Sequence, residues 1–300
     1  MSTALPSPPR RWWQPAAFNY SGAEVFVMRA LFALLIFASI KWETAPYKTQ
    51  RNPTGLAHWF DFTWLAQHPP GLFWQGVTIA GLLIYVLGRA PALGLAPICA
   101  FAVMIGTLVT SKAMHHSWQL VTLIVLAQFL VYAWPKKGQS WWKPSLEVHR
   151  LATYASTVVF AATYVVCGVV KLVNSDFQWI QKAPLLSVQL LKSNWSGYYD
   201  TLKPIPEWLP KLTQMIVEYP NLARLFFGSG LLIELLGFTV LINRRWAFFS
   251  GLAIIAMHLS ISKIMDLNFE YHMAAAFIFL INLPGLKRTF GTKAIARSAE

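Results

Sequence analysis

The sequence predicts an all-α, polytopic integral membrane protein with about eight transmembrane helices and interfacial helices on its outer face. Of the 300 residues, 56% are hydrophobic and 12% are charged, and the mean hydropathy is +0.45. A soluble domain of this size could not bury so much apolar surface, whereas lipid solvates it. The apolar residues also form separate runs close to the ~20 residues that a helix needs to cross a bilayer.

The apolar runs place the spans in order. The first run is too long for the apolar core of a cleavable signal peptide, so we expect it to be retained. Pro97 interrupts the third run, and the last two runs carry polar residues. The eight predicted spans are 22–42, 72–89, 92–111, 117–134, 148–173, 222–242, 245–264 and 268–285.

Two connecting segments are rich in aromatic residues and predict the interfacial helices. Residues 43–71 contain an aromatic run at 58–65 that is too short to cross a bilayer. Residues 174–221 contain several Trp, Tyr and Pro residues and a short amphipathic stretch at 185–191. Such segments can cap buried polar groups and so form a lipid-accessible pocket, or they can simply anchor the protein at the interface.

The distribution of charge predicts the orientation. A net charge of +13 would suggest nucleic-acid binding in a soluble protein, but here the basic residues lie in loops between spans, so no nucleic acid is expected. We expect both termini to be cytoplasmic in a bacterial inner membrane, with one transmembrane domain (22–285) between an N-terminal segment (1–21) and a basic tail (286–300). The basic residues on the terminal side are Arg10, Arg11, Arg89, Lys136, Lys137, Lys143, Arg244, Arg245, Lys287, Arg288, Lys293 and Arg297.

Ionisable residues collect at the opposite, outer ends of the spans. Lys171 lies at the outer end of the fifth span, where it is either a snorkelling cation or a desolvated amine that can act as a base. His115 and His116 open the fourth span, either as interfacial residues or with one imidazole directed inward. Charged groups at membrane depth are costly, so they are candidate functional residues.

Three further polar residues lie within or beside apolar runs. His258 in the seventh span needs a polar partner, and His272 begins the eighth span just across the loop. Glu234 lies in the middle of the sixth span, where it is either paired or protonated, and Arg29 is one candidate partner.

Several classes of site are not indicated. There is no HExxH, GxSxG, P-loop or dinucleotide-binding motif, and Cys99 and Cys167 show no CxxC spacing. No metal is therefore expected. Transporters often show paired repeats with broken helices, and no clear repeat is present here.

Three stretches together resemble the membrane domain of the vitamin K-dependent gamma-carboxylase family, also called the horizontally transferred transmembrane domain. Residues 167–172, followed by Trp179, resemble the family's A-G-V-K-K-L-x-x-x-W run, with Lys171 at its second lysine. Residues 116–120 resemble its N-H-S-Y-L run. Residues 233–258 resemble its later pair of spans, which also ends in a histidine.

The resemblance implies an enzyme with lyase or oxidoreductase chemistry, in which Lys171 is a base, His116 its hydrogen-bonding partner, and His258 orients substrate. The substrate and cofactor would be lipid-like, such as a reduced quinone. The family's carboxylases also carry a large lumenal domain that binds a propeptide, and no part of residues 286–300 corresponds to it. The alternative is a non-catalytic membrane subunit that binds a quinone, lipid or protein partner. The residues expected to contact substrate are His115, Trp118, Trp179 and His272.

Overall fold

The computed structural model describes residues 19–40, 44, 48–51, 53, 55–112, 119–134, 138–202 and 204–291. Within these ranges the chain forms helices and no strand, which confirms the all-α prediction. Five described helices are long and apolar enough to cross a membrane: Gly22–Ser39, Pro91–Ser111, Leu146–Asn174, Pro220–Leu241 and Arg244–Met265. The structure therefore supports an integral membrane protein.

Helices occupy all eight of the predicted spans, although the number that crosses the bilayer stays a prediction. The first half contains α1 (Gly22–Ser39), η2 (Gly55–His58), α2 (Trp64–Gln67), α3 (Leu72–Leu87), α4 (Pro91–Lys112), α5 (Gln119–Ala133) and α6 (Leu146–Asn174). The second half contains α7 (Trp179–Lys182), η3 (Ala183–Leu185), α8 (Leu186–Thr201), α9 (Trp208–Glu218), α10 (Pro220–Leu235), η4 (Leu236–Leu241), α11 (Arg244–Met265), α12 (Glu270–Ala276), η5 (Phe277–Ile281), η6 (Leu283–Gly285) and α13 (Leu286–Phe290). Pro97 does not interrupt α4.

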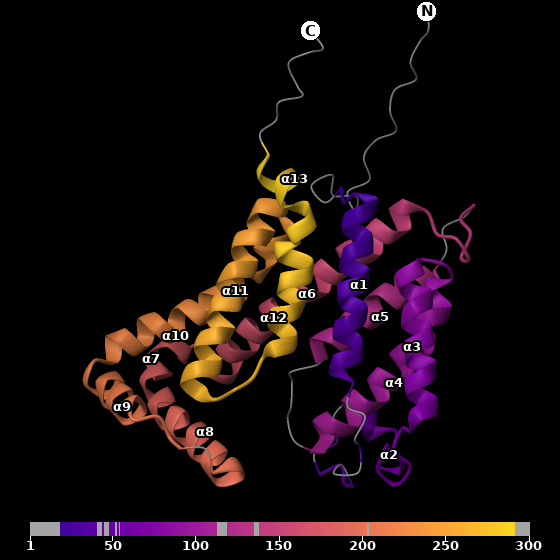
Figure 1. Cartoon of the computed structure of the whole chain (residues 1–300). Coiled ribbons are helices and arrows are strands. Elements are labelled where there is room, and N and C mark those ends of the chain that lie inside the picture. The colour runs from indigo at the N-terminus through magenta and orange to yellow at the C-terminus, as the bar shows by residue number, and fades with distance from the viewer. Residues whose placement is uncertain are drawn as a thin grey trace, which may run out of the picture.

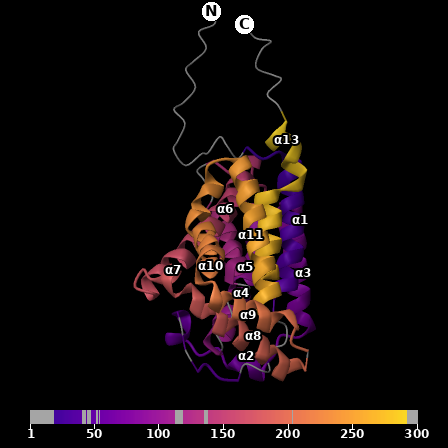
Figure 2. The same ribbon diagram turned by 90° about the vertical axis from the view of Figure 1, so that its left-hand side faces the viewer.

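The long helix α6 connects two groups of helices (Figure 1). One side of α6 packs on α5, α5 packs on α4, and α4 packs on α3. The other side of α6 packs on α10 and η4. Figure 2, turned by 90°, shows α10 and α11 lying over α6. The short helices of the two aromatic segments, among them α2, α8 and α9, lie at the end of the bundle away from α13. This end is called the outer end below.

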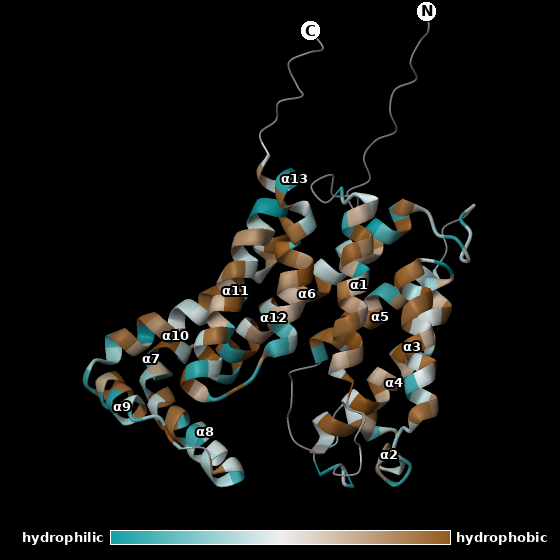
Figure 3. Cartoon of the chain, viewed as in Figure 1, coloured by the Kyte–Doolittle hydropathy of each residue, from teal (hydrophilic) through white to brown (hydrophobic). Residues whose placement is uncertain are grey.

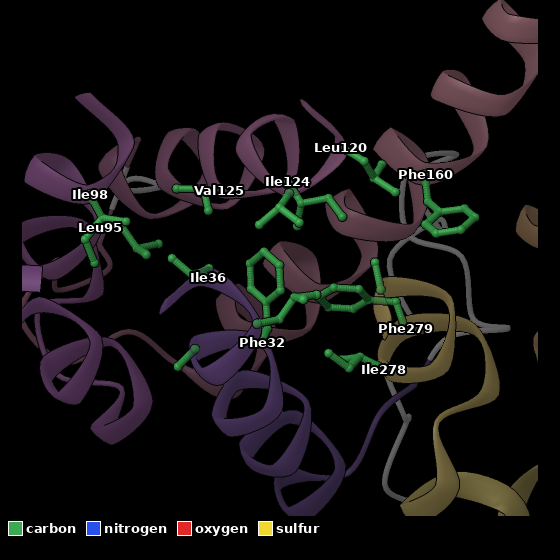
Figure 4. Close-up of a cluster of buried hydrophobic side chains, with 14 of the residues drawn as sticks. Phe32, Ile36, Leu95, Ile98, Leu120, Ile124, Val125, Phe160, Ile278 and Phe279 are labelled. Carbon is green, nitrogen blue, oxygen red and sulfur yellow. The ribbon is translucent and has the colours of Figure 1, made fainter. Parts of the chain in front are cut away.

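Interlocking aromatic and aliphatic side chains form the core where α1, α5, α6 and η5 meet (Figure 4). Phe32 and Phe279 lie edge to face with ring centroids 5.1 Å apart, and Ile124 and Phe160 are fully buried beside them. Many other apolar side chains remain exposed around the helices. Figure 3 shows that hydrophobic residues, in brown, make up much of each long helix. This outer apolar surface is what lipid-facing helices require.

Two glycines bring α6 unusually close to α10 and η4. A Cβ at Gly168 of α6 would lie 2.9 Å from Leu235 Cδ2, and a Cβ at Gly237 would lie 2.8 Å from Tyr164 Cβ. At Gly168 the facing atom ends a flexible side chain that can move, but at Gly237 it is the Tyr164 Cβ, so glycine is needed there for this approach. The α-helix also tightens to a 3-10 helix at Leu236, beside this contact.

Arg29 on α1 is buried without a carboxylate beside it among the described residues. Its guanidinium donates to the Tyr85 carbonyl (3.4 Å) and lies 3.3 Å from His149 Nδ1. Gly88 makes room for it, because a Cβ there would lie 2.4 Å from the guanidinium. Arg29 thus satisfies the C-terminal end of α3, whose helix dipole favours a cation. The suggested pairing of Arg29 with Glu234 is therefore wrong.

A buried carboxylate joins both ends of the chain. Glu24, at the start of α1, forms ion pairs with Arg244 of α11 and with Arg288 of α13, the latter at 2.7 Å. Asn282 also donates to Glu24 at 3.1 Å. The first and last described helices therefore meet at one end of the bundle.

We predict that Gly237→Ala destabilises the protein, with Gly230→Ala as the matched control. The new Cβ would collide with Tyr164 on α6, and such overpacking costs about 1–3 kcal/mol. At Gly230 the nearest atom to a new Cβ is Met257 Sδ at 3.8 Å, an ordinary contact. Thermal unfolding in detergent, followed by circular dichroism, measures both. Equal stability of the two variants would contradict the close packing.

We also predict that Glu24→Gln lowers the free energy of unfolding by about 3 kcal/mol, because two arginines lose a buried countercharge. Glu147→Gln is the control: Glu147 forms only an exposed pair with Arg150 on the same helix, and its loss should cost less than about 1 kcal/mol. Chemical unfolding in mixed micelles measures the difference. A loss no larger in Glu24→Gln than in the control would refute this role for Glu24.

Candidate functional site

One face of α6 carries the residues that begin the site. Tyr164, Gly168 and Lys171 follow one another at spacings of four and three residues, so they share a face of the helix. That face is directed at α10 and η4, because Gly168 and Tyr164 contact Leu235 and Gly237. The same spacing therefore positions Lys171 beside α10.

Lys171 and Glu234 form a two-point ion pair between α6 and α10. Lys171 Nζ lies 2.5 Å from Glu234 Oε1 and 2.6 Å from Oε2. The carboxylate side chain is 9% exposed and the lysine side chain 34% exposed. A charge at this depth needs a partner, and here each of the two charges has the other. Lys171 Nζ also lies 5.5 Å from the ring centroid of Trp179, a cation–π distance.

His258 on α11 lies next to this pair through Tyr164. The Tyr164 hydroxyl and His258 Nε2 are 2.6 Å apart, a short hydrogen bond between α6 and α11. The His258 ring stacks on the Phe269 ring with centroids 4.7 Å apart. The His272 ring centroid lies 5.5 Å from that of His258. Tyr164 shares a face of α6 with Lys171, so its hydrogen bond to His258 connects α11 to that face.

Two ring nitrogens of the site have no hydrogen-bond partner among the residues that the structure describes. They are Nδ1 of His258, a residue only 5% exposed, and Nε1 of Trp179. Buried polar atoms are normally satisfied, and exceptions often mark a place for a bound molecule or water. The two atoms flank the Lys171–Glu234 pair and the Tyr164–His258 pair.

The surroundings of the site are apolar. Cys167, one turn before Lys171 on the same face of α6, is exposed. Val170 and Leu232 are also exposed, and the helices that carry them are apolar enough to cross a membrane. The exposed side of the ion pair therefore adjoins surface suited to lipid. Chemically, the site can hold a proton in two places: between the amine and the carboxylate, and between the phenol and the imidazole.

Four of the seven predicted site residues lie together. Lys171 lies over Trp179, and His258 lies beside His272. Tyr164, on the same face of α6 as Lys171, links the two pairs through its hydrogen bond to His258. The other three, His115, His116 and Trp118, lie outside the described residues.

The sequence does not single out two members of the site, and the partner of a third is not the candidate that it offers. Tyr164 was not singled out, although its spacing from Gly168 and Lys171 places it on the same helical face. Phe269 had no such signal, because it lies in the loop between α11 and α12. Glu234 was recognised as needing a partner, and that partner is Lys171. Within the described ranges, no three His, Cys, Asp or Glu side chains are arranged to hold a metal ion.

Comparisons with known proteins add no family to this description. The chain matches no protein-family model, no curated protein and no solved structure.

Proposed function

We propose that this chain is a carboxylase-like membrane enzyme that acts on a quinol or a similar lipid-like molecule at its outer end. The observation that carries the proposal is the contact of Lys171 with Glu234 beside the hydrogen bond of Tyr164 with His258. The resemblance of residues 167–172 to the carboxylase motif points to the same lysine.

The Lys171–Glu234 pair supplies a route to a neutral amine. When the ammonium proton passes to the Glu234 carboxylate, both groups become neutral, which an apolar environment favours over two separated charges. The free amine then accepts the hydroxyl proton of a quinol, giving a quinolate and restoring the ammonium. Glu234 is thus a positioning residue and proton store for Lys171.

The ring nitrogens without protein partners suit the recognition of a quinol. His258 Nδ1 and Trp179 Nε1 could each donate a hydrogen bond to a ring oxygen, and Phe269 offers an aromatic surface. The exposed apolar surface around Cys167 and Val170 would admit such a molecule from the bilayer. In this arrangement the outer end faces away from the cytoplasm of a bacterial inner membrane, and Tyr20 and Gly291 lie on the cytoplasmic side.

A non-catalytic subunit that binds a quinone, lipid or protein partner is the second candidate. The bidentate ion pair favours it, because Glu234 stabilises Lys171 as a cation and thereby opposes a role as base. Exposed aromatic residues of α8, Trp195 and Tyr199, would offer a contact surface for a partner.

Replacement of Lys171 by arginine should separate the two functions. A guanidinium keeps the charge and can still pair with Glu234, but it cannot become a base. In the carboxylase family that residues 167–172 resemble, the quinolate is oxidised by molecular oxygen, so oxygen uptake would report the step. We expect Lys171→Arg to lower oxygen uptake with a reduced naphthoquinone by ~100-fold or more, the usual contribution of a general base. Copurification of quinone, measured by mass spectrometry, should persist.

The matched control is Lys263→Arg, an exposed lysine at the same outer end. It should keep the wild-type rate. An active Lys171→Arg variant would refute the base, and a wild-type protein that neither binds nor oxidises the quinol would refute the enzyme altogether.

A double-mutant cycle tests the ion pair independently of any activity. Lys171→Met should destabilise the protein, because Glu234 then remains buried with no countercharge. Adding Glu234→Gln should recover part of that loss, with a coupling of about 1–3 kcal/mol in thermal unfolding. Additive losses in the double variant would show that the two side chains do not interact.

A further inference from the structure

Four basic side chains gather at the end of the bundle where α11 and α13 meet. They are Arg244 and Arg245 at the start of α11, and Lys287 and Arg288 in α13. Glu24 is the only carboxylate that bonds any of them among the described residues, and it pairs with Arg244 and Arg288. Arg245 and Lys287 are exposed, so this α11–α13 patch retains a clear positive charge.

Exposed aromatic side chains border the same patch. Trp246 and Phe249 project from the first turns of α11, and Phe290 lies within 5.0 Å of Phe248 and 6.1 Å of Phe249 between ring centroids. Aromatic residues of this kind settle at the boundary between headgroups and acyl chains. The patch therefore lies where a membrane-spanning helix leaves the hydrocarbon. In Figure 3 hydrophilic residues, in teal, lie in α13 and at the upper end of α11, and most of the remaining length of α11 is hydrophobic.

The opposite end of the molecule does not share this charge. On α8, α9 and the loops beside them, basic residues alternate with acidic ones. The described acidic residues at that end include Asp61, Asp176, Asp200, Glu207, Glu218, Asp266 and Glu270. The positive surface is thus confined to one end of the bundle.

We propose that the α11–α13 patch is a binding site for the headgroup of an anionic phospholipid. Arg245 and Lys287 would contact the headgroup phosphates, since arginine and lysine are the usual phosphate ligands. Trp246, Phe249 and Phe290 would pack on the glycerol and upper acyl chains. Arg245 is held in place by its Nε hydrogen bond to the Thr289 carbonyl at 3.1 Å, which joins α11 to α13.

Native mass spectrometry of the delipidated full chain tests this site. Phosphatidylglycerol and phosphatidylcholine with the same acyl chains are titrated separately. Basic residues near an anionic surface contribute about 1 kcal/mol each, so Arg245→Gln with Lys287→Gln should weaken phosphatidylglycerol binding by about 10- to 30-fold. Phosphatidylcholine binding should not change, and 1 M salt should remove the preference of the wild-type protein.

The matched control is Lys211→Gln with Lys263→Gln, two exposed lysines at the outer end. It should keep the preference for phosphatidylglycerol, as should Arg245→Lys with Lys287→Arg, which retains both charges and guards against a folding defect. Equal binding of the two lipids by the wild-type protein would overturn the proposal. So would an equal loss in the control pair.

Discussion

The close approach of α6 and α10 is the constraint on which the outer half of the structure depends. Gly168 of α6 lets that helix touch the end of α10, and Gly237 lets η4, which continues α10, touch it as well. This contact brings Lys171 within hydrogen-bonding distance of Glu234. In an apolar environment neither charge could remain alone. Packing and electrostatics therefore depend on each other here: the glycines place the charges, and the ion pair in turn holds α10 on α6.

The chain stabilises its buried charges in three different ways. Lys171 and Glu234 neutralise one another, whereas Glu24 is shared by two arginines, and Arg29 has the carbonyl end of α3 and a histidine. The last two arrangements join helices at the end that holds α13, away from the outer end. Their interactions are extensive, with buried partners from several helices, and they suit a structural role. The ion pair at Lys171 differs in its surroundings, because the rings of Trp179, Tyr164 and His258 gather on the same side of α6.

The positions of the helices could be predicted from the sequence, because a helix that crosses the hydrocarbon core needs about 20 consecutive apolar residues and such runs are visible in the sequence. The gathering of Lys171, Trp179, His258 and His272 at one end followed from the alternating direction of successive spans. Pairings between helices could not be read in the same way. Glu234 can pair with Lys171 because glycine lets the face of α6 that carries Lys171 lie against α10. A single sequence has no pattern that predicts which face of α6 meets α10. Phe269 lies in a loop, where helical periodicity gives no information.

The Lys171–Glu234 pair also changes what the resemblance to the carboxylase family implies. A lysine with no carboxylate would lose its proton through desolvation alone. A lysine held by two carboxylate oxygens is stabilised as a cation, so it becomes a base only if the carboxylate takes up the proton. The apolar surroundings favour that exchange, since they penalise charge separation, while the exposed third of the lysine side chain opposes it. A ligand that covers the exposed side would remove water from the ammonium and shift the proton towards Glu234. Binding and activation of the base would then be a single event, and the amine would become reactive only when substrate is present.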